Sequence, residues 1–144
     1  DNTGHGTHVA GIAAGWFYGI APKANIISVK VRGATTENVT QGSLLVCDLH
    51  THSLGPSGWK GSVINMSVGV PASTVLRQAV ESAYSKGIPM AAAAGNDNVE
   101  AYQTPRIYEE VMCTGATDRI YHKATFSNCG GAVDLIAPGH RVMS

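Results

Sequence analysis

The segment GHGTHVAG, residues 4–11, holds two histidines three positions apart among glycine, threonine and small apolar residues. Residues at i and i+3 of a helix lie on one face, so His5 and His8 could bind a metal ion together. Alternatively, one imidazole could transfer protons while the other packs, because imidazole gains and loses a proton near neutral pH. The two alternatives require different partners elsewhere in the chain.

Two further groups have side chains that can carry chemistry. The segment DLHTHS, residues 48–53, offers an aspartate and two histidines that could bind a metal. It falls at a predicted helix end, where histidine commonly interacts with the last carbonyls, so we interpret it as structural. The segment SGWK, residues 57–60, fits the SxxK pattern of serine–lysine acylases. We attribute that match to chance in a loop rich in glycine and serine.

Alternating helix and strand patterns predict the elements that must position these side chains. We expect helices at 4–16, 37–50 and 74–86, and strands at 24–31, 62–68, 88–94, 111–116 and 133–136. In the first helix the expected buried stripe is Val9, Ile12, Ala13 and Trp16. Strands separated by helices indicate an α/β fold with a parallel sheet and helices on both faces.

The third helix has clear signals at both ends. Ser73 is its expected N-cap, and Gly87 follows its last turn. Its apolar stripe consists of Leu76, Ala79, Val80 and Ala83. We therefore expect this helix to pack firmly on the sheet.

Parallel sheets bind ligands beyond the carboxyl ends of their strands. Small or polar residues follow two predicted strands, in INMSVGV (64–70) and in AAAAGNDN (91–98). Asn96 lies in the second of these turns, where it could be a turn residue alone or a side-chain donor. These two strand ends and the turn at 4–8 are the places where we expect chemistry.

The composition limits the class of protein. The chain has 144 residues, no net charge and no block of like charges, so nothing favours nucleic acid or a membrane surface as a partner. That length suits one hydrophobic core, and we expect a monomer. Three cysteines without a CxxC pair do not indicate a zinc site or a disulfide scaffold.

Six segments together resemble the subtilisin-like serine proteases, or subtilases. In chain order they are DNTGHGTHVAGIAAG, GIAPKANIISVKV, VINMSVG, AAAAGNDN, CTGATDR and TFSNCGGAVDLIAPG. The resemblance covers nearly the whole chain. The link AAGWFYGIAPKA is short and lacks the longer calcium-binding insertion of bacterial subtilisins, which makes the proteinase K branch the closer match.

The resemblance implies a secreted serine endopeptidase that hydrolyses proteins or peptides through a Ser/His/Asp triad. It gives His5 the role of general base and Asn96 that of side-chain donor to the oxyanion. His8 is then a structural neighbour. A propeptide or a protease inhibitor would be a further partner, and the chemistry requires no cofactor.

Substrate binding is implied at the two strand ends. The residues assigned to it are Ser67, Val68, Gly69, Ala93, Ala94 and Gly95. Small residues on both walls leave room for a large apolar or aromatic side chain before the scissile bond. The chain departs from the family pattern at Val70-Pro71 and at Glu37-Asn38, so pocket shape and subsite preference can differ there.

The resemblance also implies a structural calcium site and a disulfide position. Asp134 matches a calcium-binding aspartate, and Glu110 and Met112 stand where backbone carbonyls bind the ion. Oxygen ligands suit this hard cation. Cys113 matches a proteinase K half-cystine whose partner lies downstream.

Residues 1–144 contain neither the family's catalytic-aspartate segment nor its "GTSMA" nucleophile segment, and Ser144 lacks the "GTS" context. We therefore expect residues 1–144 to be a partial subtilisin-like peptidase domain, an internal fragment that is inactive in isolation. The alternative is a catalytically inactive homologue that acts as a binding protein.

Overall fold

The computed structural model describes residues 3–53 and 61–144. Its centre is a parallel sheet of four strands in the order β1-β2-β3-β4. The strands are β1 (Ile64–Met66), β2 (Met90–Ala93), β3 (Val111–Thr117) and β4 (Leu135–Pro138). Because all four run in the same direction, their carboxyl ends meet at one edge of the sheet.

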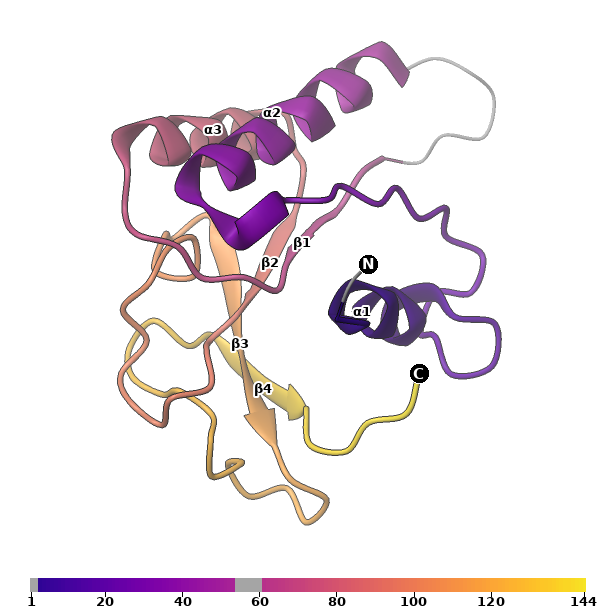
Figure 1. Cartoon of the computed structure of the whole chain (residues 1–144), viewed down its shortest axis with the longest axis vertical. Coiled ribbons are helices and arrows are strands. Elements are labelled where there is room, and N and C mark those ends of the chain that lie inside the picture. The colour runs from indigo at the N-terminus through magenta and orange to yellow at the C-terminus, as the bar shows by residue number, and fades with distance from the viewer. Residues whose placement is uncertain (1–2, 54–60) are drawn as a thin grey trace.

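Helices flank this sheet on two sides (Figure 1). They are α1 (His5–Ala14), α2 (Thr36–Ser53) and α3 (Thr74–Ser85), with a short 3₁₀ turn, η1 (Arg32–Ala34), before α2. The helices α2 and α3 lie together on one side of the strands, and α1 lies apart from them on the other. The predicted α/β class with a parallel sheet is confirmed.

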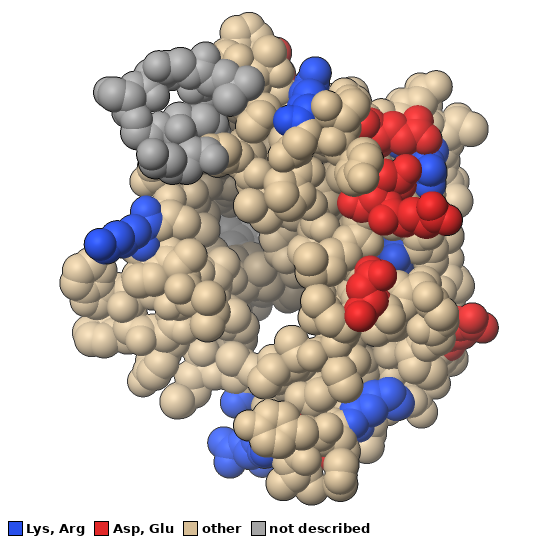
Figure 2. Space-filling view, turned by 180° about the vertical axis from the view of Figure 1, so that it is seen from behind, with Lys and Arg blue, Asp and Glu red and all other residues tan. Residues whose placement is uncertain are grey.

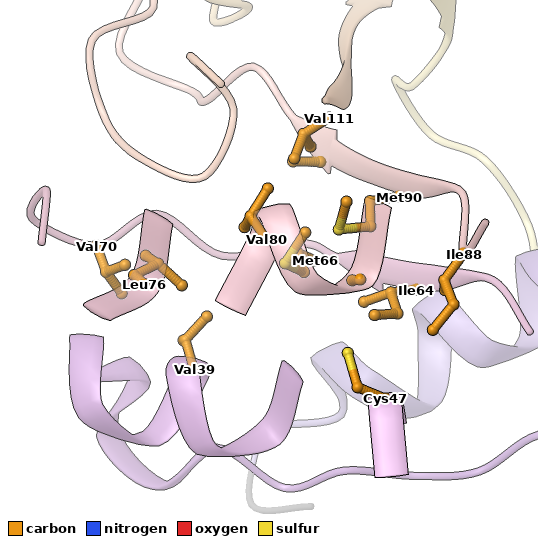
Figure 3. Packing of buried hydrophobic residues seen from close by; sticks show 12 residues of the cluster. Val39, Cys47, Ile64, Met66, Val70, Leu76, Val80, Ile88, Met90 and Val111 are labelled. Atoms are coloured by element: carbon orange, nitrogen blue, oxygen red, sulfur yellow. The ribbon is translucent and has the colours of Figure 1, made fainter. Parts of the chain in front are cut away.

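The hydrophobic core lies between the sheet and the pair formed by α2 and α3 (Figure 3). The buried residues of this cluster are Val39, Cys47, Ile64, Met66, Val70, Leu76, Val80, Ala83, Ile88, Met90, Ala92 and Val111. Alternate residues of β1 and β2 face it, as the period of two in a strand requires. This packing fixes the strand ends on which the site is built.

The helix α3 forms as its sequence predicts. Ser73 Oγ accepts a hydrogen bond from the Leu76 amide at 3.3 Å, which caps the first turn. Gly87 takes a positive φ of 70° directly after the helix. All four residues of the predicted stripe are buried. This helix is therefore specified by local sequence and packing together.

Truncating the core side of α3 should destabilise the protein. Leu76 has no exposed surface, so Leu76→Ala leaves a cavity and should lower the free energy of unfolding by about 2–5 kcal/mol. The matched control is Val75→Ala at the neighbouring position, which is 57% exposed and should cost little. Urea denaturation monitored by circular dichroism measures both. Equal losses would contradict the burial of Leu76 against the sheet.

The prediction of a buried strand at residues 24–31 is wrong. This segment has no regular secondary structure and joins no ladder among the described residues, and Ile26 and Ile27 are 52% and 57% exposed. Val31 packs against the core, and Val29 approaches Gly42 of α2. A β-branched run forms a strand only when a neighbouring strand pairs with it, and here α2 takes that side.

The helix α1 forms, but its predicted stripe is not buried. Val9 and Ile12 are half-buried, Ala13 is exposed, and Trp16 lies beyond the helix end with 83% of its surface exposed. Figure 2 shows the surface hollowed between the side of the molecule where α1 lies and the rest of it. An apolar stripe is buried only where another element covers it, and no described element covers this one.

Candidate active site

The two strand ends singled out above lie side by side. β1 pairs with β2 through Met66↔Ala92, so the chain leaves both strands at the same edge of the sheet. Residues 67–69 follow β1 and residues 94–98 follow β2. The sheet register alone therefore brings the two predicted substrate-binding segments together.

His5 joins this edge from α1. Gly4 takes a positive φ of 75° before the helix, which turns the chain so that His5 begins it. His5 Nε2 lies 3.2 Å from the Ser67 carbonyl oxygen, which can only accept, so Nε2 is the donor here. This contact spans 62 residues of sequence and places the predicted base at the end of β1.

His8 points to a different partner. Its Nε2 contacts the Val142 carbonyl oxygen at 3.1 Å, near the carboxyl end of the chain. Within residues 3–53 and 61–144, no three His, Cys, Asp or Glu side chains form a group suited to a metal ion. The two histidines of GHGTHVAG therefore have separate partners, and the metal-pair alternative has no third ligand in the described structure.

The turn that carries Asn96 is held by a buried asparagine. Asn128 is 1% exposed, and its Oδ1 accepts from the amides of Asp97 at 2.9 Å and Val99 at 3.2 Å. Its Nδ2 donates to the Ala94 carbonyl at 3.0 Å, so one side chain clamps both sides of the turn. The exposed Asn96 is thereby presented on rigid backbone. Sequence reasoning missed Asn128, although the FSN segment contains it.

A cavity of about 200 Å³ opens between the two strand ends. Its lining residues are Ser67, Val68, Gly69, Ala93, Gly95, Asn96, Asp97, Gln103 and Arg106. Five of the six residues assigned to substrate binding are therefore among them, together with the predicted oxyanion donor. Ala94 is not: it is 1% exposed, and its carbonyl accepts from Arg106 and Asn128 behind the wall.

Gln103 and Arg106 line the cavity without having been predicted. Their loop is fixed to the end of β1, since Val70 and Thr104 exchange backbone hydrogen bonds of 2.9 and 3.2 Å. Val70 itself is fully buried in the core, so this departure from the family pattern does not narrow the cavity directly. Burial lowers the pKa of the Arg106 guanidinium, which nevertheless stays charged.

Comparison with known proteins decides the family. The model described as "Subtilase family" matches residues 1–144. This chain belongs to the subtilase family. The prediction from sequence is confirmed, together with its proteinase K-like branch.

Curated subtilases and solved structures agree with this assignment. Subtilisin-like protease 5 of Arthroderma otae is 42% identical, with 100% of this chain and 37% of that protein covered. Proteinase T of Parengyodontium album is 40% identical, with coverage of 100% and 50%. A cold adapted subtilisin-like serine proteinase matches with a TM-score of 0.82 and 36% identity, covering 96% of this chain and 50% of that one. The chain thus spans about half the length of such relatives, or less.

The residues assigned to calcium lie around the start of β3 in this subtilase. Asp134 Oδ2 accepts from the Cys113 amide at 2.7 Å, which brings the carboxylate to the strand. Glu110 Oε1 accepts from Arg77 Nη2 at 2.8 Å, so its side chain is engaged while its carbonyl is a separate oxygen. Cys113 is a buried free thiol. Burial, and then the Asp134 charge, raise the pKa of that thiol.

The histidines of the segment DLHTHS have hydrogen-bond partners of their own. His52 Nδ1 contacts the Asp48 carbonyl at 2.8 Å, and His50 Nδ1 contacts Ser62 Oγ at 3.1 Å. His52 Nδ1 also lies 3.2 Å from the Asp48 carboxylate, so these two candidate ligands contact each other while His50 faces Ser62. Ser57 and Lys60 lie outside the described residues.

The remaining surface is distinguished by its acidic groups. Figure 2 shows Asp and Glu side chains gathered on one side and Lys and Arg side chains mostly set apart.

A larger cavity of about 540 Å³ is lined by Ala72, Ser73, Thr74, Arg77, Gln78, Glu81 and Tyr108. It contains no predicted catalytic residue. No helix in the described part of the chain is long and apolar enough to cross a membrane.

Proposed function

We propose that this chain contributes the general base and the oxyanion donor of a serine endopeptidase. The observation that carries this proposal is the contact between the His5 ring and the Ser67 carbonyl, 3.2 Å apart. Ser67 lines the same cavity as Asn96, so this contact supports a base next to that cavity. Membership of the subtilase family and the resemblance to solved proteinases support the same function.

In the proposed reaction, a serine hydroxyl attacks the scissile carbonyl while His5 takes its proton. His5 then gives this proton to the leaving amine, and water hydrolyses the acyl-enzyme by the same steps. In the described residues, the His5 ring contacts neither a serine hydroxyl nor a carboxylate. A triad therefore requires an orienting aspartate at Nδ1, which would leave Nε2 free to accept from the serine.

The strand ends have defined tasks in this reaction. Substrate backbone would pair with residues 67–69 as an added strand, since this segment is free of sheet pairing in the described structure. Asn96 would donate to the oxyanion from the turn that Asn128 clamps. A donor fixed in advance stabilises developing charge without reorganisation. The remaining lining residues would receive the side chain before the scissile bond.

We place the proposed activity outside the cell, with proteins or peptides as substrates and a propeptide or protease inhibitor as a further partner. The low charged fraction of 14% and the relationship to fungal subtilisin-like proteases support this placement. Secretion by the native host, measured by immunoblotting of medium and cells, tests it.

Labelling with a fluorophosphonate tests the peptidase proposal directly. The protein expressed from its complete reading frame should react at a single serine and hydrolyse a casein substrate. If a folded protein neither reacts nor hydrolyses any peptide, the proposal fails. Tight binding of intact peptides without turnover would instead support the inactive homologue that acts as a binding protein.

We also propose that Asp134, with the carbonyls of Glu110 and Met112, holds a structural calcium ion. One Asp134 oxygen binds the Cys113 amide, and its other oxygen makes no hydrogen bond among the described residues. The carboxylate and two carbonyls are hard oxygen donors, which suit calcium, and water would complete the six to eight ligands that calcium takes.

Calcium should accordingly raise the melting temperature of the protein. An ion at about 100 times its dissociation constant adds about 2.7 kcal/mol of stability. Asp134→Asn should remove most of this gain, whereas Asp48→Asn, which changes an exposed carboxylate on α2, should keep it. Thermal melts with calcium and with EDTA measure the effect. A gain that survives Asp134→Asn would contradict this site.

A further inference from the structure

A buried arginine lies at the cavity between the two strand ends. Arg106 is 5% exposed, and Nη1 donates to the Ala94 carbonyl at 2.7 Å. Its Nε is buried without a hydrogen-bond partner in the described structure. An arginine that only braced the turn would need no opening toward a cavity, but Arg106 is one of the lining residues.

The guanidinium lies between the opposite walls of the cavity. A Cβ added to Gly69 would collide with Arg106 Nη2, and one added to Gly95 would collide with Nη1. Gly69 follows β1 and Gly95 follows β2, so the planar group lies close to both segments and lines the open space that remains between them. The absence of side chains at both glycines therefore leaves room for the guanidinium, and Gly95 also has a positive φ of 109° that favours glycine.

The charge of Arg106 has no direct counter-ion. No ion pair involving Arg106 occurs among residues 3–53 and 61–144. Asp97 also lines the cavity, but it is exposed to solvent and lies beyond ion-pair distance. Burying an unpaired charge is costly, and a carboxylate that enters the same space recovers much of that cost. The unpaired positive charge of Arg106 therefore favours a negatively charged group in this cavity.

We propose that Arg106 makes this pocket select aspartate or glutamate as the residue before the scissile bond. This inference rests on the proposed peptidase function. A guanidinium binds a carboxylate with two parallel charge-assisted hydrogen bonds, and Gln103 adds a polar amide beside it. The volume of about 200 Å³ admits the side chain of aspartate or glutamate, so the charge of Arg106 rather than the size of the cavity carries the selection. This proposal is the alternative to the large apolar or aromatic side chain expected from the small residues on both walls.

The test uses the protein expressed from its complete reading frame. Fluorogenic tetrapeptide amides differ only at the residue before the scissile bond, which is Glu, Gln, Asp, Asn, Ala, Leu or Phe. Glu and Asp should exceed their uncharged counterparts Gln and Asn by about 10- to 100-fold in kcat/KM, the range of a charge-assisted hydrogen bond. This comparison needs no variant, so it decides the proposal even if changes at Arg106 impair folding.

Variants then assign the preference to Arg106. Arg106→Gln should remove the discrimination between Glu and Gln, and Arg106→Lys should retain part of it. Arg119→Gln, which changes an exposed arginine outside the cavity, is the matched control and should leave it intact. Melting temperatures establish that each variant is folded.

Three results would overturn the inference. In the first, the wild-type protein cleaves after Leu, Phe or Gln at least as well as after Glu. In the second, it accepts only Ala and Arg106→Gln admits larger apolar residues, which means that the arginine acts as bulk. In the third, no peptide is hydrolysed and no fluorophosphonate binds, and then the peptidase proposal falls as well. Active enzyme with the wrong preference refutes the inference alone.

Discussion

Replacing His5 by alanine should lower kcat by about 10⁶-fold, the magnitude known for the triad histidine of the related enzyme subtilisin. The reason is that a serine hydroxyl is a poor nucleophile until a neighbouring base removes its proton. His5 is the histidine whose ring contacts the carbonyl of Ser67, a residue that lines the cavity between the two strand ends. Labelling by a fluorophosphonate should disappear together with turnover, since both require the activated serine.

His8→Ala provides the matched control for this experiment. His8 lies one turn further along α1, where its ring contacts the Val142 carbonyl rather than the cavity. Its loss should change stability modestly and leave kcat within about 10-fold of the wild type. If His8→Ala abolished labelling while His5→Ala retained it, the assignment of the base would be reversed. Steady-state kinetics and labelling of both variants, checked for folding by circular dichroism, separate these outcomes.

Sequence alone predicts the elements whose signals are local. The helix α3 has a serine cap, a four-residue stripe and a terminal glycine, and all of them act as expected. The four strands of the sheet also lie within a few residues of their predicted positions. These signals predict the structure correctly because each depends on neighbours within a few residues, or on burial that the sheet and α2 provide.

The predictions from sequence fail where contacts between distant parts of the chain decide whether a segment pairs as a strand or is buried. The run ANIISVKV has strong strand propensity, yet residues 24–31 have no pairing partner in the described structure. Likewise, the periodicity of α1 predicts a helix correctly but cannot say whether another element covers its stripe. Propensity describes what a segment fits, and burial depends on what lies beside it.

The site shows the same limit. The motifs place His5 and Asn96 at strand and helix ends, but they give no role to Arg106, or to Asn128 although the TFSNCGG segment contains it. Asn128 matters because it reaches 31 residues back to the amide of Asp97. Arg106 matters because the Val70–Thr104 bridge carries its loop to the cavity. Glycine and alanine walls alone suggest an apolar pocket, and only the structure shows which side chain lies between them.

The loss of the Asn96 amide should be the second-largest effect. Asn96→Ala should lower kcat by about 10²–10³-fold, the range measured for the oxyanion asparagine of subtilisin, with little change in KM. The amide is needed only when charge develops on the carbonyl oxygen, so the loss concerns the transition state. The matched control is Asn98→Gly, which removes an amide from the same turn while suiting its positive φ of 55°. Asn98 is not among the cavity residues, so kcat should change little. Equal losses in both variants would mean that the turn, rather than the Asn96 donor, carries the effect.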